Sequence, residues 1–207
     1  AQICDRTQST SKGSARFHQE MVARDGYARG VNDSTRVAAI IPAENAGDTI
    51  AATIRACRAI PRADLVLVVD DGSDDDPGNA ARNAGAVVVR HSVNRGRSSA
   101  METGGSVVAM RDIEGRDPRL LLFVGAALGE DATSLAALVQ PVADKEADLT
   151  IAVPPHQAAR PAGPAVRLAR NSIFKATGWA TAAPLATDRC ITREAFAVAS
   201  PLARDWG

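Results

Sequence analysis

Short apolar runs that alternate with segments of helical pattern are the feature that most constrains the fold of this chain. The runs cover residues 37–41, 65–69, 86–90, 120–124 and 149–153. They are apolar at nearly every position, which is typical of strands covered on both faces. Strands that alternate with helices form βαβ units, so the pattern predicts an α/β fold with a mostly parallel sheet.

Residues that start and stop helices punctuate the segments between these runs. Asp48 is the expected N-cap of the first helix, and Pro77 suits the first position of the second. Gly85 is expected to end the second helix in a left-handed conformation. Further helices are predicted over residues 98–111, 131–139, 165–177 and 192–199, with irregular chain from 177 to 189.

Residues 1–36 lack this pattern, because no period of about 2 or about 3.6 residues holds for long there. We therefore predict a flexible extension over residues 1–36, with a short helix near residues 17–23. Residues 37–207 form the predicted folded domain, and a total length of 207 residues suits one domain with an appendage.

The composition excludes several classes of protein. The chain has 24 basic and 24 acidic residues, which argues against a nucleic-acid binder. Its longest apolar stretch, residues 120–128, is too short to span a membrane. Three widely spaced cysteines have no zinc-site spacing, and a sparse odd count is typical of a reducing compartment. We expect a cytoplasmic protein.

The ends of the predicted strands are the places to look for chemistry, because open α/β sheets bind ligands beyond the carboxyl ends of their strands. Residues 70–73, Asp-Asp-Gly-Ser, follow the second run and could accept hydrogen bonds from a base or a ribose. The alternative is ordinary turn chemistry. Residues 94–99 contain two arginines before a helix, which suits an anion site or an ordinary surface loop. Neither a P-loop nor a GxGxxG motif follows the first run.

Three stretches carry a resemblance to a known family: VAAIIPAENAGDTIAATIRA, DLVLVVDDGSDDD and AGAVVVRHSVNRGRSSAMETG. Together they resemble the nucleotide-binding half of family 2 glycosyltransferases, in particular actinobacterial members related to glucosyl-3-phosphoglycerate synthases and dolichol-phosphate-sugar synthases. The resemblance runs from about residue 36 to residue 207. It implies a GT-A fold, a three-layer α/β/α sandwich, and a nucleotide-diphosphate sugar linked to UDP or GDP. It also implies a domain that is short at its C-terminal end.

The resemblance implies a set of nucleotide-binding residues at the strand ends: Pro42, Ala43, Glu44, Asp71, Ser73, Gly96, Arg97 and Ala126. In this assignment Asp71 holds the edge of a uracil-type base, and Arg97 lies near the nucleotide.

The chain departs from the family where a metal would bind. The family has an acidic D-x-D motif after its fourth strand, which holds Mg²⁺ or Mn²⁺ against the diphosphate. This chain has Gly125, Ala126 and Ala127 there, so no metal ligand is predicted. Glu130 and Asp131 are expected to cap the next helix instead. Asp188 is a candidate catalytic base, with a turn or surface role as the alternative.

These observations favour a glycosyltransferase-like protein that binds a nucleotide-diphosphate sugar, with transfer impaired or absent. One alternative is a metal-independent transferase that stabilises the diphosphate with Arg95 and Arg97. Another is a non-catalytic assembly domain with a protein partner or a second copy of itself. His18, His91 and His156 are isolated in the sequence, and a structural or solvated role is predicted for them.

Overall fold

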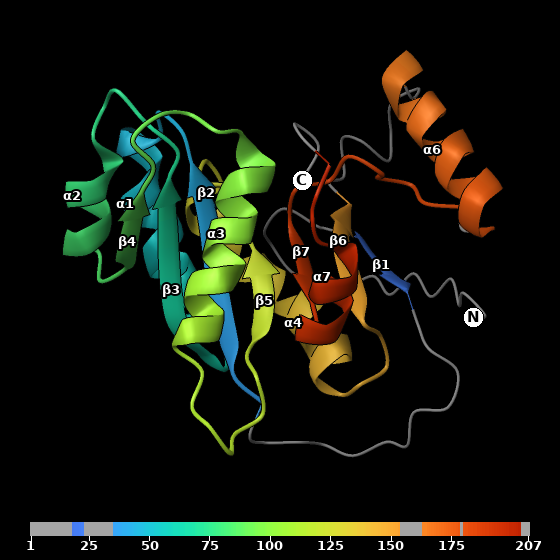
Figure 1. The fold of residues 1–207 in the computed structure, drawn as a ribbon, viewed down its shortest axis with the longest axis horizontal. Coiled ribbons are helices and arrows are strands. Elements are labelled where there is room, and N and C mark those ends of the chain that lie inside the picture. Colours follow the sequence, from blue (N-terminus) through green and yellow to red (C-terminus); the bar gives the residue numbers. More distant parts are fainter. Residues whose placement is uncertain (1–17, 23–34, 154–162, 179, 204–207) are drawn as a thin grey trace.

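The computed structural model describes residues 18–22, 35–153, 163–178 and 180–203 (Figure 1). Within them, seven strands form one sheet: β1 (His18–Val22), β2 (Val37–Ala43), β3 (Ala63–Asp70), β4 (Val87–Arg90), β5 (Leu120–Phe123), β6 (Leu149–Val153) and β7 (Arg189–Ile191). Their order is β1-β6-β7-β5-β2-β3-β4. The five predicted strands are thereby confirmed at nearly their predicted bounds.

Strand direction follows the predicted plan except at β1 and β7. Strand β2 pairs in parallel with β3 and with β5, and β3 pairs in parallel with β4. Strand β7 runs antiparallel between β5 and β6, and β1 runs antiparallel along the outer side of β6. Strands β2 to β6 therefore share one direction, which confirms a mostly parallel sheet. The prediction of irregular chain up to residue 189 missed β7.

Helices cover both faces of this sheet. The described helices are α1 (Gly47–Arg58), α2 (Pro77–Asn83), α3 (Arg97–Met110), the 3₁₀ helix η1 (Gly129–Leu135), α4 (Ala136–Ala143), α6 (Pro164–Thr177) and α7 (Arg193–Ala199), of which all but α6 pack on the sheet. On one face, Ile54 of α1 and Leu138 of α4 pack against Ile41 of β2 in one apolar core. On the other face, Met101 of α3 packs with Ile40 in a second core. Alternate residues of β2 thus face opposite layers, and the three-layer sandwich is confirmed.

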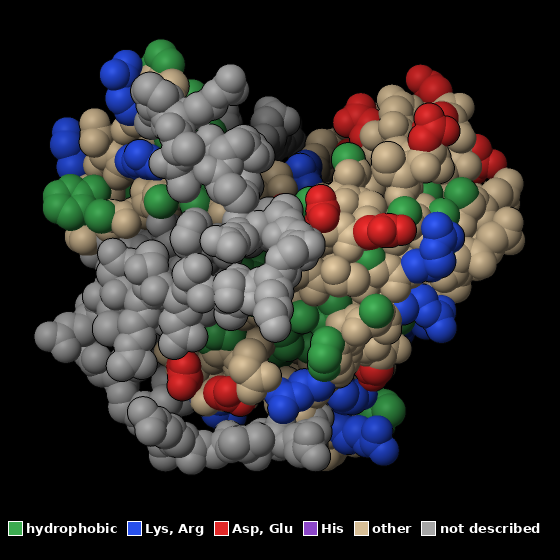
Figure 2. All heavy atoms as spheres, turned by 180° about the vertical axis from the view of Figure 1, so that it is seen from behind, with side chains coloured by type: hydrophobic (Ala, Val, Ile, Leu, Met, Phe, Trp, Pro, Cys, Tyr) green, Lys and Arg blue, Asp and Glu red, His purple; other side chains and the backbone are tan. Residues whose placement is uncertain are grey.

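Helix α6 differs from the other helices because it extends away from the sheet (Figure 1). Its side chains Leu168 and Phe174 are exposed. Lys and Arg side chains stand out along this helix when the molecule is seen from behind (Figure 2). None of the described helices combines the length and the apolar character that a membrane crossing requires.

Some helix ends differ from the predictions. Asp48 is not the N-cap of α1; Ala46 is, and Asp48 lies in the first turn. The helix expected from residue 131 begins as η1 at Gly129, and Glu130 and Asp131 lie in its first turn without capping it. By contrast, Pro77 does occupy the start of α2, with Gly85 at a φ of 89° just beyond its end.

The short helix predicted near residues 17–23 is wrong, because His18–Val22 form strand β1. The five residues pair with β6, so backbone pairing with a sheet edge decided their conformation over local helical preference. Most of residues 1–36, as well as His156, lies outside the described residues. The division of the chain at residue 36 stays a prediction.

Candidate functional site

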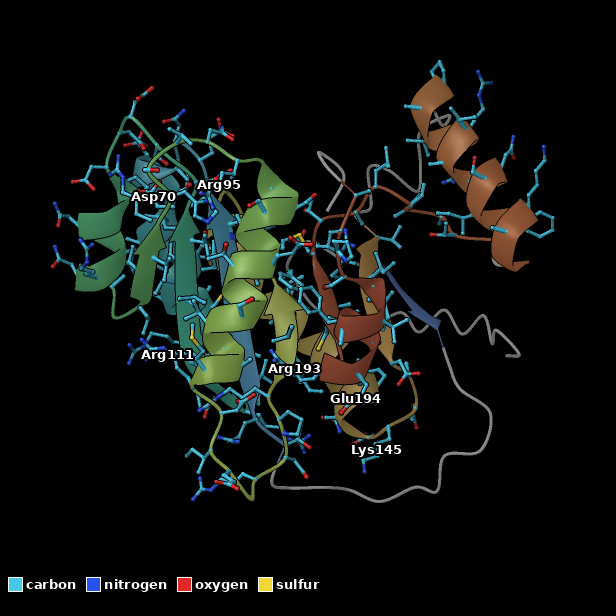
Figure 3. All side chains as sticks on the ribbon, in the orientation of Figure 1. Asp70, Arg95, Arg111, Lys145, Arg193 and Glu194 are labelled. Atoms are coloured by element: carbon cyan, nitrogen blue, oxygen red, sulfur yellow. The ribbon has the colours of Figure 1, made fainter. Side chains whose placement is uncertain are left out.

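A pocket of about 710 Å³ opens at the carboxyl ends of β2, β3 and β5. Figure 3 labels Asp70 and Arg95 at this end of the sheet. The lining residues come from the strand exits, from the first turns of α1 and α3, and from the loop before β7. They are Pro42, Ala43, Glu44, Asn45, Ala46, Asp48, Thr49, Asp71, Arg97, Ala100, Gly125, Ala126, Ala127, Leu128, Thr187 and Asp188. The pocket lies where the strand-end rule predicts a ligand site.

Most of the residues assigned to the nucleotide by resemblance meet at this pocket. Those that line it are Pro42, Ala43, Glu44, Asp71, Arg97 and Ala126. The candidate base Asp188 lines it too, because β7 is antiparallel and starts at the edge of the sheet where β5 ends. Two of the assigned residues, Ser73 and Gly96, are not among the lining residues.

Ser73 supports the pocket wall through hydrogen bonds, although it does not line the pocket itself. It is buried, its backbone N–H donates to Asp70 Oδ1 at 2.9 Å, and its hydroxyl accepts from the backbone N–H of Asn45 at 3.0 Å. Asn45 Oδ1 in turn accepts from the backbone N–H of Asp74 at 3.0 Å. These bonds connect the end of β2 to the end of β3. Ser73 therefore positions Asn45, which lines the pocket beside Glu44.

Gly96 allows the backbone to turn in a left-handed conformation just before α3. Its φ of 87° is left-handed, and its N–H donates to Asn94 Oδ1 at 2.9 Å. Such a φ favours glycine. Gly96 faces a neighbouring hollow that Arg95 also lines.

The two adjacent aspartates at the end of β3 have different surroundings. Asp70 is fully buried, and its Oδ2 lies 3.3 Å from Arg90 Nη1. Asp71 lines the pocket. Its backbone N–H donates to the carbonyl of Ala43 at 2.8 Å, which extends the β2–β3 pairing by one step. Asp70 therefore stabilises the turn, and Asp71 is the one of the two that lines the pocket.

His91 holds Asp71 in place. His91 Nδ1 lies 2.6 Å from Asp71 Oδ1, and His91 Nε2 lies 2.9 Å from Thr103 Oγ1 of α3. The backbone N–H of Arg95 donates to the same Oδ1 at 3.0 Å. The predicted structural role of His91 agrees with these bonds. Sequence reasoning missed its link to Asp71, because no local spacing connects residues 71 and 91.

Residues 125–129 form a braced wall of the pocket. The backbone N–H of Gly125 donates to Asp188 Oδ1 at 2.6 Å. The carbonyl of Ala126 accepts from the hydroxyls of Thr53 at 2.8 Å and Thr49 at 3.2 Å. This backbone carbonyl is therefore already used inside the protein.

The wall does not suit a divalent cation. Positions 125 and 127 carry no oxygen ligand, and the described residues contain no group of three or more His, Cys, Asp or Glu side chains that could hold a metal ion. Mg²⁺ and Mn²⁺ prefer carboxylate oxygens. At positions 125 and 127 the wall therefore offers no side-chain oxygen to a metal ion.

Charged groups gather at the same wall. Asp188 is 7% exposed, and burial raises its pKa above the ordinary value, against the opposing effects of the Gly125 N–H and of Arg97. Burial lowers the pKa of Arg97 and of Arg189, while the charge of Asp188 opposes that shift in both. Two guanidinium groups thus surround one buried carboxylate, and Arg97 lines the pocket.

The parallel strands, the two helical layers and the pocket at the strand ends form an α/β fold of the GT-A type, which solved structures share. Residues 38–109 match the sequence model of the family described as Glycosyl transferase family 2. This match confirms the predicted resemblance to that family over residues 38–109, and the solved structures share the fold.

Among curated proteins, the chain is 46% identical over 71 residues to the succinoglycan biosynthesis protein ExoU of Rhizobium meliloti (strain 1021). The alignment covers 32% of this chain and 21% of ExoU.

Two solved structures share the fold at low sequence identity. Glucosyl-3-phosphoglycerate synthase of M. tuberculosis has a TM-score of 0.58 and 19% identity over 81% of this chain and 64% of that one. Mannosyl-3-phosphoglycerate synthase of Rubrobacter xylanophilus has a TM-score of 0.56 and 23% identity over 78% of this chain and 55% of that one. Other structures of the M. tuberculosis enzyme hold UDP with Mg²⁺ or Mn²⁺. The present chain spans less than two thirds of each of these relatives.

Proposed function

We propose that the pocket binds a nucleoside-diphosphate sugar and that metal-dependent glycosyl transfer is impaired or absent in this chain. One observation carries the proposal. The pocket joins an oriented carboxylate, Asp71, with a guanidinium, Arg97, and has no carboxylate at positions 125 and 127.

The base end of the pocket is formed by the exits of β2 and β3. Asp71 can accept a hydrogen bond from a base N–H, because an ionised carboxylate only accepts. Pro42 and Ala43 supply apolar contact beside it. Glu44 Oε1 accepts from Asn94 Nδ2 at 2.5 Å, which links this side of the pocket to the loop before α3.

The diphosphate end is formed by the start of α3. Arg97 is the first residue of that helix, and its guanidinium adds to the positive end of the helix dipole. A phosphate pairs well with such a group, since charge-assisted hydrogen bonds to oxyanions are strong. Arg95 has a different place: its backbone supports Asp71, and its side chain lines the neighbouring hollow. Of the two arginines, Arg97 is the better phosphate ligand.

The absence of carboxylates at positions 125 and 127 bears most directly on transfer. A metal at a diphosphate stabilises the charge that develops on the leaving group, which is worth several kcal/mol in the transition state. The described residues offer no such metal site. Metal-independent transfer is the second candidate, and the placement of Arg97 in the pocket favours it over a purely structural domain.

Calorimetric titration with UDP, GDP and their glucose and mannose conjugates, first with Mn²⁺ and then with EDTA, tests the proposal. We expect binding that EDTA leaves unchanged. Arg97→Ala should weaken it by about tenfold to a hundredfold, as expected for a lost hydrogen bond to a charged group. Arg95→Ala is the matched control and should change affinity little.

Three results would decide against parts of this proposal. Binding that requires Mn²⁺ would show that the wall does hold a metal. Sugar transfer at an ordinary rate with Mn²⁺ would refute the impaired activity. A folded protein that binds no nucleotide would favour the assembly domain, with a protein partner or a second copy.

We also propose that the protein acts in the cytoplasm, because its cysteines are sparse, and that it does not act on nucleic acid, because its charges balance.

A further inference from the structure

We infer that Asp188 is an internal counterion of Arg97 in the pocket wall and takes up a proton when a nucleoside-diphosphate sugar binds. This inference rests on the proposed function and deepens it, because it makes the affinity of that site depend on pH. It gives Asp188 a positioning role in binding, whether or not the carboxyl also serves as a base in transfer.

Asp188 is fixed in the pocket wall by its neighbours. Its Oδ1 accepts from the backbone N–H of Gly125 at 2.6 Å, and the side chain of Thr187 also forms a hydrogen bond with it. Asp188 is buried, yet Asp188 and Thr187 both line the pocket. A carboxyl held in this way has little freedom to move away from a bound anion, so its protonation state has to respond instead.

The charges around Asp188 come from several elements. Arg97 at the start of α3 and Arg189 in β7 are the cations that attract it. The thiol of Cys57 in α1 interacts with the charge of Asp188, and the thiol stays neutral near pH 7 because its pKa is raised to about 12. The sequences of the neighbouring strands β5 and β6, LLLF and LTIAV, contain no charged residue.

Among the described residues, three other carboxylates line the same pocket, and Asp188 differs from each of them. Glu44 and Asp48 are exposed, so water screens their charges. Asp71 is buried, but its Oδ1 accepts two hydrogen bonds, one of them from His91, and such bonds favour a charged carboxylate. At Asp188 the effect of burial outweighs the hydrogen bonds and the nearby cations, and the pKa is raised.

A bound diphosphate changes the charges at Asp188 in two ways. Its oxygens engage Arg97, whose attraction otherwise lowers the pKa of Asp188. Its negative charges also lie in the same pocket as the carboxylate, and like charges favour protonation. Both effects raise the pKa of Asp188 further. A proton from the solvent therefore binds to Oδ2, because Oδ1 already accepts the N–H of Gly125.

The direction of the pH dependence follows from this coupling. Well below the pKa of the free protein, Asp188 is protonated before and after binding, and no proton is taken up. Between the pKa values of the free and the bound protein, binding takes up a proton, so the affinity falls as pH rises. Well above both values the carboxyl stays charged, and the affinity is constant at its lowest level.

The experiment is calorimetric titration of UDP-glucose and GDP-mannose into the full chain between about pH 5.5 and pH 8. Nucleotide sugars are used because both phosphates are esterified, which removes the terminal phosphate group that titrates near pH 6. Each titration is repeated in two phosphate-free buffers of different ionisation enthalpy, and the difference in heat gives the number of protons taken up. We expect a maximum of about 0.3 to 1 proton, and an affinity at least about threefold lower at pH 8 than at pH 5.5.

Two substitutions test whether Asp188 takes up that proton. Asp188→Asn keeps an oxygen for the N–H of Gly125 but cannot titrate. Its proton uptake should fall below about 0.1, and its affinity should stay within about 1.5-fold across the pH range. Asp74→Asn, at an exposed carboxylate outside the pocket, is the matched control and should behave as the wild type.

The outcomes distinguish this coupling from the function on which it rests. A wild type that binds neither nucleotide sugar refutes the proposed function itself. Binding with no proton uptake at any pH refutes the coupling and leaves nucleotide binding intact. Proton uptake that persists in Asp188→Asn shows that another group, such as His91, takes the proton. If Asp188→Asn fails to fold, infrared difference spectroscopy of the wild type decides: the nucleotide sugar that binds must produce the band of a protonated carboxyl, and its absence contradicts the inference.

Discussion

Asp188 combines a buried charge with a buried hydrogen-bond acceptor, and two substitutions separate these properties. Asp188→Asn removes the charge but keeps an oxygen for the backbone N–H of Gly125, which donates to Asp188 Oδ1 at 2.6 Å. Asp188→Ala removes both. We expect the Asn variant to be at least as stable as the wild type near neutral pH, and the Ala variant to be less stable.

The direction of the charge effect follows from the pKa of Asp188, which burial raises above the ordinary value of 3.8. Well below pH 3.8 the carboxyl is protonated in both the folded and the unfolded chain, and its contribution to stability is complete. As pH rises, the unfolded chain loses the proton first, so the free energy of unfolding falls until pH passes the folded pKa. The raised pKa already includes the attraction of Arg97 and Arg189. Because asparagine cannot ionise, the Asp188→Asn variant does not lose this free energy of unfolding as pH rises.

The cost of the Ala variant comes from the amide left behind. The N–H of Gly125 would lose its acceptor at a partly buried site, which costs about 1–3 kcal/mol. Urea unfolding followed by circular dichroism between pH 4 and pH 8 measures both effects. Asp74→Asn, at an exposed carboxylate, is the control and should stay within about 0.5 kcal/mol of the wild type. If Asp188→Asn lost as much stability as Asp188→Ala, ionised Asp188 would be a net stabilising group and the reasoning would be wrong.

Two further predictions concern the turn after β3 and the buried thiols. Gly72 has a φ of 75°, and a Cβ added there would lie 2.6 Å from the backbone N of Asn94. Gly72→Ala should therefore lower the free energy of unfolding by more than about 1 kcal/mol. An unchanged urea midpoint would contradict this prediction. Burial raises the pKa of Cys57 and of Cys190 to about 12. In a Cys4→Ser variant, both thiols should therefore resist Ellman's reagent at pH 8 until urea unfolds the chain, whereas rapid reaction of the native protein would show that one is accessible.

The sequence predicted the strands that consist of an uninterrupted apolar run and missed β1 and β7, which have none. Strands β2, β3 and β5 lie inside the sheet, so their apolar residues follow one another without interruption. Strand β7 has only three residues, Arg-Cys-Ile, and its pairing with β5 and β6 exists only in the folded sheet. Strand β1 likewise depends on pairing with β6.

For the candidate site too, the sequence predicted some features and missed others. The strand-end rule brought Asp71 and Arg97 to one pocket, because the carboxyl ends of parallel strands share an edge. Ser73 was assigned to the ligand by resemblance, yet its hydrogen-bonding groups are used inside the turn. The bond between His91 and Asp71 joins residues 20 positions apart, and it depends on how β3 and β4 pair. A side-chain contact of this kind leaves no periodic signal in the sequence.

Gly125 and Asp188 belong to one arrangement in the pocket wall. A Cβ added at Gly125 would lie 3.3 Å from Asp188 Oδ1, so a longer side chain would force Asp188 to move. An aspartate at position 125 would also place a second carboxylate beside a buried one, and two such charges repel strongly unless a cation lies between them. The glycine removes both conflicts and gives its N–H to Asp188 instead. The pocket wall is therefore built around one buried carboxylate and its neighbouring guanidiniums, and a Gly125→Asp substitution would strain that arrangement.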